Sequence, residues 1–153
     1  MSDATAAKIK MHGIYIYQFA KNVYWPSKYT SGDFEIGIYG NKDVFDQLRE
    51  SYDNKMNGSQ NMKFHYYPSI KDIEDCHLLY VCEEKNGLID QVNKAISKKT
   101  VLVSEGPNLD AMGSMINFIY IGSKLKYQIN QTKANNEQIK IGQLIVKLAH
   151  TII

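Results

Sequence analysis

The chain has 153 residues, 44% hydrophobic and 22% charged, which is the usual composition of one globular domain. Its 18 basic and 16 acidic side chains leave a net charge of +2, and Arg49 is the only arginine. This balance argues against a nucleic-acid partner, which would require a strongly basic surface. Apolar runs such as Ile14 to Tyr17 are far shorter than the roughly 20 residues that span a bilayer, so we expect no membrane insertion.

The start of the chain shows no signal peptide, because it has neither a charged first segment nor an apolar stretch. Two interpretations are consistent with this start. The protein is cytoplasmic, or the sequence is a mature chain in which Met1 replaces a leader.

A helix is expected at residues 5–24. Trp25-Pro26 ends it, because proline disfavours a helical conformation in the residue before it. One apolar stripe of this helix is formed by Ile9, Ile16, Phe19, Ala20 and Val23.

The next elements alternate in type. The pattern predicts strands at 34–39, 62–67, 77–81 and 100–104, helices at 44–52 (with Asp43 as its cap) and 88–96, and a short polar turn or helix at 69–74.

The last third predicts a hairpin, with strands at 116–121 and 124–129 around Gly122-Ser123. From Asn130 onward the chain is expected to be helical. One face of the last helix is then formed by Ile141, Leu144, Ile145, Leu148 and Ile152.

This order of elements predicts a three-layer α/β fold. Strand–helix–strand alternation favours a mainly parallel mixed sheet with helices on both faces, and the late hairpin adds antiparallel strands at one edge. We expect one domain over residues 1–153. Residues 1–7 are expected to be a disordered start, or one added for expression.

The polar residues predict no catalytic, metal or cofactor site. No nucleophile elbow, phosphate loop or metal-ligand spacing occurs, and the four histidines are scattered. We therefore expect no enzyme activity. His77 is expected to be a hydrogen-bonded core residue or to lie at the edge of its strand, and Glu83-Glu84 to be solvated loop charges.

Two cysteines flank the strand predicted at 77–81. Six residues of extended chain span roughly 20 Å, whereas a disulfide joins Cα atoms about 4.4–6.8 Å apart. We therefore expect that Cys76 and Cys82 do not bond to each other.

The first helix carries more apolar side chains than one sheet-facing stripe requires. Ile14, Tyr17 and Tyr24 flank that stripe and are candidates for contact with a partner protein or a second copy. In the alternative, the closing helix covers them within the same domain. Trp25 is expected to pack at the junction of helix and sheet, and it joins the candidate partner-binding residues if its ring is exposed.

Two segments carry a family resemblance. They are Tyr15 to Pro26 (YIYQFAKNVYWP) and Gly113 to Asn130, in which Ile-Asn-Phe precedes a turn and Tyr-Gln-Ile-Asn follows it. With the strands at 36–40 and 76–81 and the closing segment at 141–149, they resemble the YfiR-like family of bacterial proteins. Tyr24 stands where that family often has Glu. The cysteines that would pair in disulfides, as in the family's namesake, are missing from this chain.

The resemblance implies a three-layer α/β fold without enzyme activity. It implies a periplasmic regulatory domain that binds a membrane signalling protein, as a repressor-type module for a membrane diguanylate cyclase in cyclic-di-GMP signalling. Redox control through disulfides is not expected, because the partner cysteines are absent. A small-molecule sensor of the same fold is the alternative.

Overall fold

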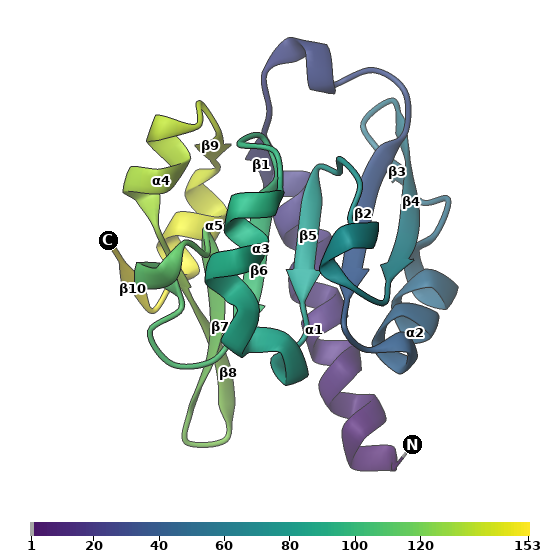
Figure 1. Ribbon diagram of the computed structural model, residues 1–153, viewed down its shortest axis with the longest axis vertical. Coiled ribbons are helices and arrows are strands. Elements are labelled where there is room, and N and C mark those ends of the chain that lie inside the picture. Colours follow the sequence, from purple (N-terminus) through teal and green to yellow (C-terminus); the bar gives the residue numbers. More distant parts are fainter. Residues whose placement is uncertain (1) are drawn as a thin grey trace.

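A mainly parallel sheet of eight strands lies at the centre of the computed structural model, which describes residues 2–153 (Figure 1). The sheet order is β10 (Thr151–Ile152), β8 (Lys124–Ile129), β7 (Ile116–Ile121), β6 (Val101–Glu105), β5 (Leu78–Val81), β2 (Phe34–Tyr39), β4 (Gln60–Tyr67) and β3 (Met56–Asn57). β8 is antiparallel to β7, β3 is antiparallel to β4, and the other neighbours are parallel.

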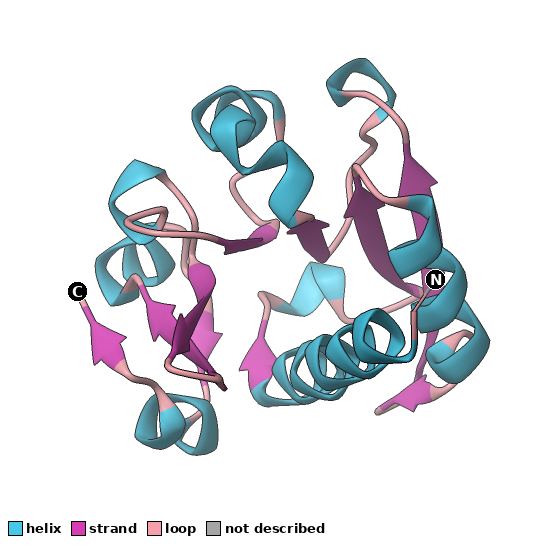
Figure 2. Ribbon diagram, turned by 90° about the horizontal axis from the view of Figure 1, so that it is seen from below, coloured by secondary structure: helices cyan, strands magenta, loops and turns pink. Residues whose placement is uncertain are grey.

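Helices cover both faces of this sheet, as Figure 2 shows in a view from below. The helices are α1 (Asp3–Asn22), α2 (Lys42–Tyr52), α3 (Ile89–Ala95), α4 (Gln131–Asn136) and α5 (Gln143–Leu148), with 3-10 turns at Ser27–Tyr29, Ile70–Asp72, Glu83–Leu88 and Asp110–Met112. Alternate residues of β5 point to opposite faces: Leu78 and Tyr80 join a large core with α1, whereas Leu79 and Val81 join a smaller core with α3. The predicted three-layer α/β fold is therefore confirmed.

The first helix differs from the prediction at both ends. It begins at Asp3, because the Ser2 hydroxyl caps it by accepting a hydrogen bond from the Thr5 N–H at 3.1 Å. The expectation of a disordered start is therefore wrong for residues 3–7, and Met1 lies outside the described residues. The helix ends two residues early because β1 (Val23–Tyr24) is extended and pairs with β9 (Lys140–Ile141).

The cap of α2 is Asn41 rather than the predicted Asp43. The Asn41 side-chain oxygen accepts hydrogen bonds from the backbone N–H groups of Asp43 at 2.9 Å and Val44 at 3.2 Å. Asp43 instead lies in the first turn of the helix, where a carboxylate favours the positive end of the helix dipole.

The predicted closing helix is wrong. The chain there forms α4, β9, α5 and β10, and the face of five apolar residues is split, because Leu144 and Leu148 are exposed whereas Ile145 is buried. Pairing of β9 with β1 interrupts the helix. At the junction the Gly142 N–H donates to the Asn22 carbonyl at 2.7 Å, and a Cβ on Gly142 would lie 2.6 Å from that oxygen.

The segment around β5 agrees with the prediction. Cys76 and Cys82 lie at opposite ends of this extended strand, and both thiols are buried and free. Burial raises the pKa of the Cys76 thiol to about 12, so this thiol stays protonated and unreactive at neutral pH. His77 is fully hydrogen-bonded: its Nδ1 accepts from the Glu35 N–H at 3.0 Å, and its Nε2 donates to the Tyr29 carbonyl at 2.6 Å.

Trp25 lies at the junction of α1 and the sheet, as expected. Its residue exposure is 9%, its indole N–H donates to the Lys99 carbonyl at 2.8 Å, and its ring meets Phe34 edge to face at a centroid distance of 5.1 Å. In this position the ring contributes to stability and is withdrawn from the surface.

We expect the Trp25→Ala substitution to lower the free energy of unfolding by about 3–5 kcal/mol, because it empties a buried site. Trp25→Phe retains most of the ring contact and loses the indole hydrogen bond, so it should cost about 1 kcal/mol. Urea denaturation followed by circular dichroism measures both. A loss below about 1 kcal/mol for the alanine variant would contradict the burial of the ring.

Candidate functional site

The amino-terminal half of α1 lies against the carboxyl ends of the parallel strands, where open α/β sheets bind their ligands. Glu105 ends β6 and is 5% exposed, and His12 on α1 is 3% exposed. The His12 Nε2 atom is hydrogen-bonded to the Glu105 carboxylate. This bond joins the first helix to the centre of the sheet.

The hydrogen bonds of His12 fix the orientation of its ring. Its Nδ1 atom lies 2.8 Å from the Lys8 carbonyl oxygen, which can only accept, so Nδ1 carries a hydrogen. Its Nε2 atom faces a carboxylate that is also an acceptor when it is ionised. Both ring nitrogens of His12 therefore face a hydrogen-bond acceptor.

Lys8 completes the cluster. Its ammonium lies 3.4 Å from Glu105 and 3.2 Å from Glu83, and it sits 5.1 Å from the centre of the Tyr120 ring. Burial alone would raise the pKa of the Glu105 carboxyl, but the hydrogen bond from His12 and the charge of Lys8 outweigh it and lower the pKa to about 2. Glu105 is therefore ionised at neutral pH.

Glu83 differs from its sequence interpretation as a solvated loop charge. Its side chain is 56% exposed, but it pairs with Lys8 on another element. A sequence reading could not find this contact, because 75 positions separate the two residues.

Ser104, which ends a predicted strand, has a structural role. Its hydroxyl is buried and lies 2.6 Å from the Ser114 hydroxyl and 2.8 Å from the Asn117 side-chain oxygen. These hydrogen bonds hold β6 to the start of β7.

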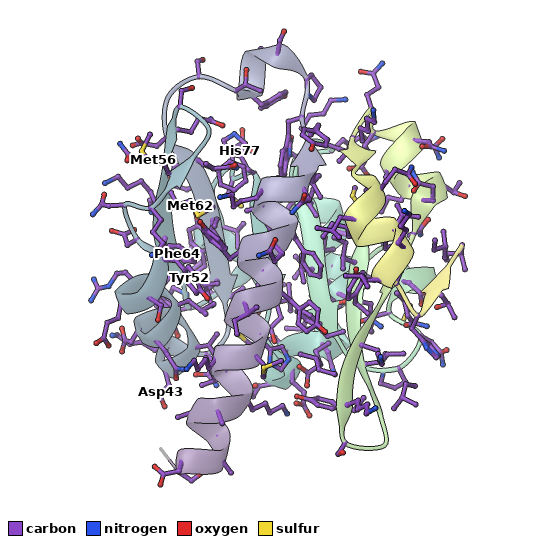
Figure 3. The ribbon with its side chains drawn as sticks, turned by 180° about the vertical axis from the view of Figure 1, so that it is seen from behind. Asp43, Tyr52, Met56, Met62, Phe64 and His77 are labelled. Atoms are coloured by element: carbon purple, nitrogen blue, oxygen red, sulfur yellow. The ribbon has the colours of Figure 1, made fainter. Side chains whose placement is uncertain are left out.

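Two hollows adjoin the Lys8 cluster. The smaller, about 100 Å³, lies between α1 and the ends of β5 and β6 and is lined by residues that include His12, Cys82 and Glu105. The larger is a groove of about 760 Å³ between the start of α1 and the β7–β8 hairpin. Figure 3 shows that these two elements project side by side at the same end of the molecule. The groove is lined by Ala4, Ala7, Lys8, Met11 and Tyr15 of α1 and by Tyr120, Ser123, Lys124, Leu125 and Lys126 of the hairpin.

The structure separates the predicted partner-binding residues. Ile14 and Tyr24 are 40% and 53% exposed. Tyr17 instead stacks on Tyr52 of α2 at a centroid distance of 5.0 Å, so α2 rather than the closing segment covers it. Trp25 is buried at the junction described above.

An apolar strip that the sequence interpretation missed continues from Ile14 toward the start of α1. It consists of Ala4, Ala7, Met11 and Ile14, all exposed, and Met11 is 45% exposed. Their spacing of three, four and three residues places them on one side of a helix. That spacing is visible in the sequence, but the expectation of a disordered start concealed it.

The family profile that matches this chain is described as YfiR/HmsC-like, and it covers residues 9–150. The chain belongs to the YfiR/HmsC-like family. This is a family of regulatory domains, and the resemblance expected from Tyr15–Pro26 and Gly113–Asn130 is thereby confirmed. No curated protein matches the chain significantly.

Solved structures support the fold. A conserved domain protein from Vibrio cholerae O1 biovar El Tor strain N16961 is 13% identical with a TM-score of 0.63, over 95% of this chain and 60% of that one. The ABC domain from Streptococcus pneumonia in complex with L-Trp is 11% identical with a TM-score of 0.56, over 78% of this chain and 55% of that one. This YfiR/HmsC-like chain thus corresponds to little more than half of either neighbour.

The described residues lack two further features. Within residues 2–153, no three His, Cys, Asp or Glu side chains are grouped so that they could hold a metal ion. No helix in the same part of the chain has the length and apolar character needed to cross a bilayer.

We expect Glu105→Gln to lower the free energy of unfolding by about 3–5 kcal/mol, because it removes the buried carboxylate that His12 and Lys8 contact. Glu83→Gln is the matched control. Its side chain is 56% exposed, so it should cost less than about 1 kcal/mol. Equal losses in urea denaturation would contradict a structural role for the buried pair.

The acid dependence of stability provides a separate check. The pKa of Glu105 is lowered from 4.5 to about 2 by folding, so its contribution is present above pH 4.5 and is lost as the pH falls toward 2. The wild type should therefore lose more stability than Glu105→Gln between about pH 4.5 and 2. Urea denaturation at several pH values measures this, and parallel curves for the two proteins would refute it.

Proposed function

We propose that this chain is a periplasmic regulatory domain that binds a membrane signalling protein and catalyses no reaction. By resemblance, the partner is a membrane diguanylate cyclase that the domain represses in cyclic-di-GMP signalling. Membership in the YfiR/HmsC-like family supports the regulatory role. The observation that carries the proposal for this chain is the exposed apolar strip on α1.

The strip has the character of a contact surface. Met11 and Ile14 are large apolar side chains that are 45% and 40% exposed on the same side of one helix. The two alanines that precede them leave the backbone of the first turns open to close approach. Continuous exposed apolar surface of this kind marks sites of protein interaction, whereas single exposed apolar residues do not.

The four residues predicted from the sequence have different parts in this proposal. Ile14 belongs to the strip, and Tyr24 extends the contact at the other end of α1, where its ring is 53% exposed. Tyr17 and Trp25 do not contact the partner in this proposal but fix the position of α1. Tyr17 packs α1 against α2, and Trp25 holds the chain just after the helix.

The small-molecule sensor has less support. The structural neighbour from Streptococcus pneumonia is described in complex with L-Trp, so a related fold holds a small ligand in that protein. The hollow at the strand ends here has about 100 Å³, whereas ligand pockets usually have about 300–1,000 Å³. The larger groove is open to solvent, which suits a protein surface better than an enclosed ligand.

The proposal is tested with the isolated periplasmic domain of a diguanylate cyclase from the same genome. We expect the double variant Met11→Ser, Ile14→Ser to bind it at least about tenfold more weakly than the wild type, because the variant removes the apolar centre of the contact. Tyr24→Ser should weaken binding by a smaller factor.

The matched control is Leu144→Ser with Leu148→Ser on α5. These leucines are 52% and 61% exposed on a different element, so this variant should bind as the wild type does. Sedimentation of the domain alone shows whether a second copy occupies the same strip. Absence of binding to the cyclase domain, or equal loss in both double variants, would refute the proposal.

A further inference from the structure

We infer that the groove between α1 and the β7–β8 hairpin receives an acidic segment of the partner protein, in which carboxylates stand beside apolar side chains. This inference rests on the proposed function, because it adds the chemistry of the partner to the site of binding. It extends the contact from the apolar strip of α1 to a second element, the hairpin.

The groove has two walls of different origin. Met11 and the two alanines of the strip line it on the side of α1, and Tyr120 and Leu125 line it on the side of the hairpin. The Tyr15 hydroxyl, 3.5 Å from the Leu125 carbonyl oxygen, joins the two walls. Both walls thus contribute apolar or aromatic side chains, and methionine and tyrosine are enriched at the buried centre of protein interfaces.

The charged residues of the groove all have one sign. Lys8, Lys124 and Lys126 line it, and no aspartate or glutamate does. Lys8 is held by Glu83 and Glu105. Lys124 and Lys126 form no ion pair with any residue of the described chain, 2–153. Two uncompensated positive charges therefore lie on the hairpin wall, and carboxylates on the partner would complement them.

The same features favour a protein segment over other anions. Arg49, the single arginine, is not among the lining residues, so the groove lacks a guanidinium group that could form two hydrogen bonds to one phosphate. Met11 and Tyr120 remain 45% and 39% exposed, so the groove is open rather than enclosed as a small-molecule pocket would be. Methionine in such a position adapts to apolar side chains of varied shape.

The test selects random 12-residue peptides from a display library on the full immobilised chain. We expect the enriched peptides to combine aspartate or glutamate with aliphatic or aromatic residues, and their affinity to fall as the salt concentration rises. The double variant Lys124→Glu, Lys126→Glu should bind the enriched peptides at least about tenfold more weakly. The control Lys140→Glu, Lys147→Glu makes the same change of net charge on other exposed lysines and should bind as the wild type does.

Three results would overturn the inference. One is that no peptide is enriched, and another is that the enriched peptides bind both charge variants equally. The third is that vesicles containing phosphatidylglycerol bind through Lys124 and Lys126 while acidic peptides do not, which would assign the groove to a membrane surface. Circular dichroism establishes that each variant is folded before binding is measured.

This inference and the proposed function can fail separately. If the cyclase domain binds and the Met11/Ile14 variant abolishes binding while the lysine variant does not, the proposed function stands and the acidic segment is refuted. If acidic peptides require Lys124 and Lys126 but the cyclase domain never binds, the groove stands and the proposed partner is wrong.

Discussion

The contact between His12 and Glu105 is the interaction on which the arrangement of the surface depends. It joins residues 93 positions apart and fixes the amino-terminal half of α1 at the end of β6. Apart from this cluster, that half of the helix is held by few polar contacts, such as the hydrogen bond from the Gln47 amide to the Ala6 carbonyl at 3.0 Å. The groove has α1 as one wall, so this contact, together with the buried Ile9 and Ile16 of the same helix, sets the position of that wall.

The path of α1 is set at a second point by Gly13. A Cβ there would lie 2.5 Å from the Leu48 side chain and 3.2 Å from that of Tyr52, so a larger residue would have to displace these side chains or move α1 away from α2. Glycine inside a helix costs about 1 kcal/mol relative to alanine. The close approach offsets that cost by allowing Tyr17 to stack on Tyr52. With His12 one position away, this crossing determines which side of α1 faces solvent.

The accuracy of the sequence predictions follows the range of the interactions that form each element. The hairpin strands at 116–121 and 124–129 are local, and their bounds were predicted correctly. The closing helix was wrong because pairing of β9 with β1 joins segments more than 100 residues apart. The contact of His12 with Glu105 could not be predicted for the same reason. The helical spacing placed Tyr17 near Ile14. It could not show that Tyr52 of α2 covers Tyr17 and leaves Ile14 exposed.

The family resemblance and the candidate contact surface lie in different parts of the molecule. Within Tyr15–Pro26, the segment that carries the resemblance, Ile16, Phe19 and Trp25 are buried, so this motif defines the fold rather than the surface. The family match begins at residue 9, after Ala4 and Ala7 of the strip. Relatives can therefore keep the motif and the fold while they change the first turns of α1 and the lysines of the hairpin. Partner choice in such a family is best sought at those exposed positions, because changing them leaves the core intact.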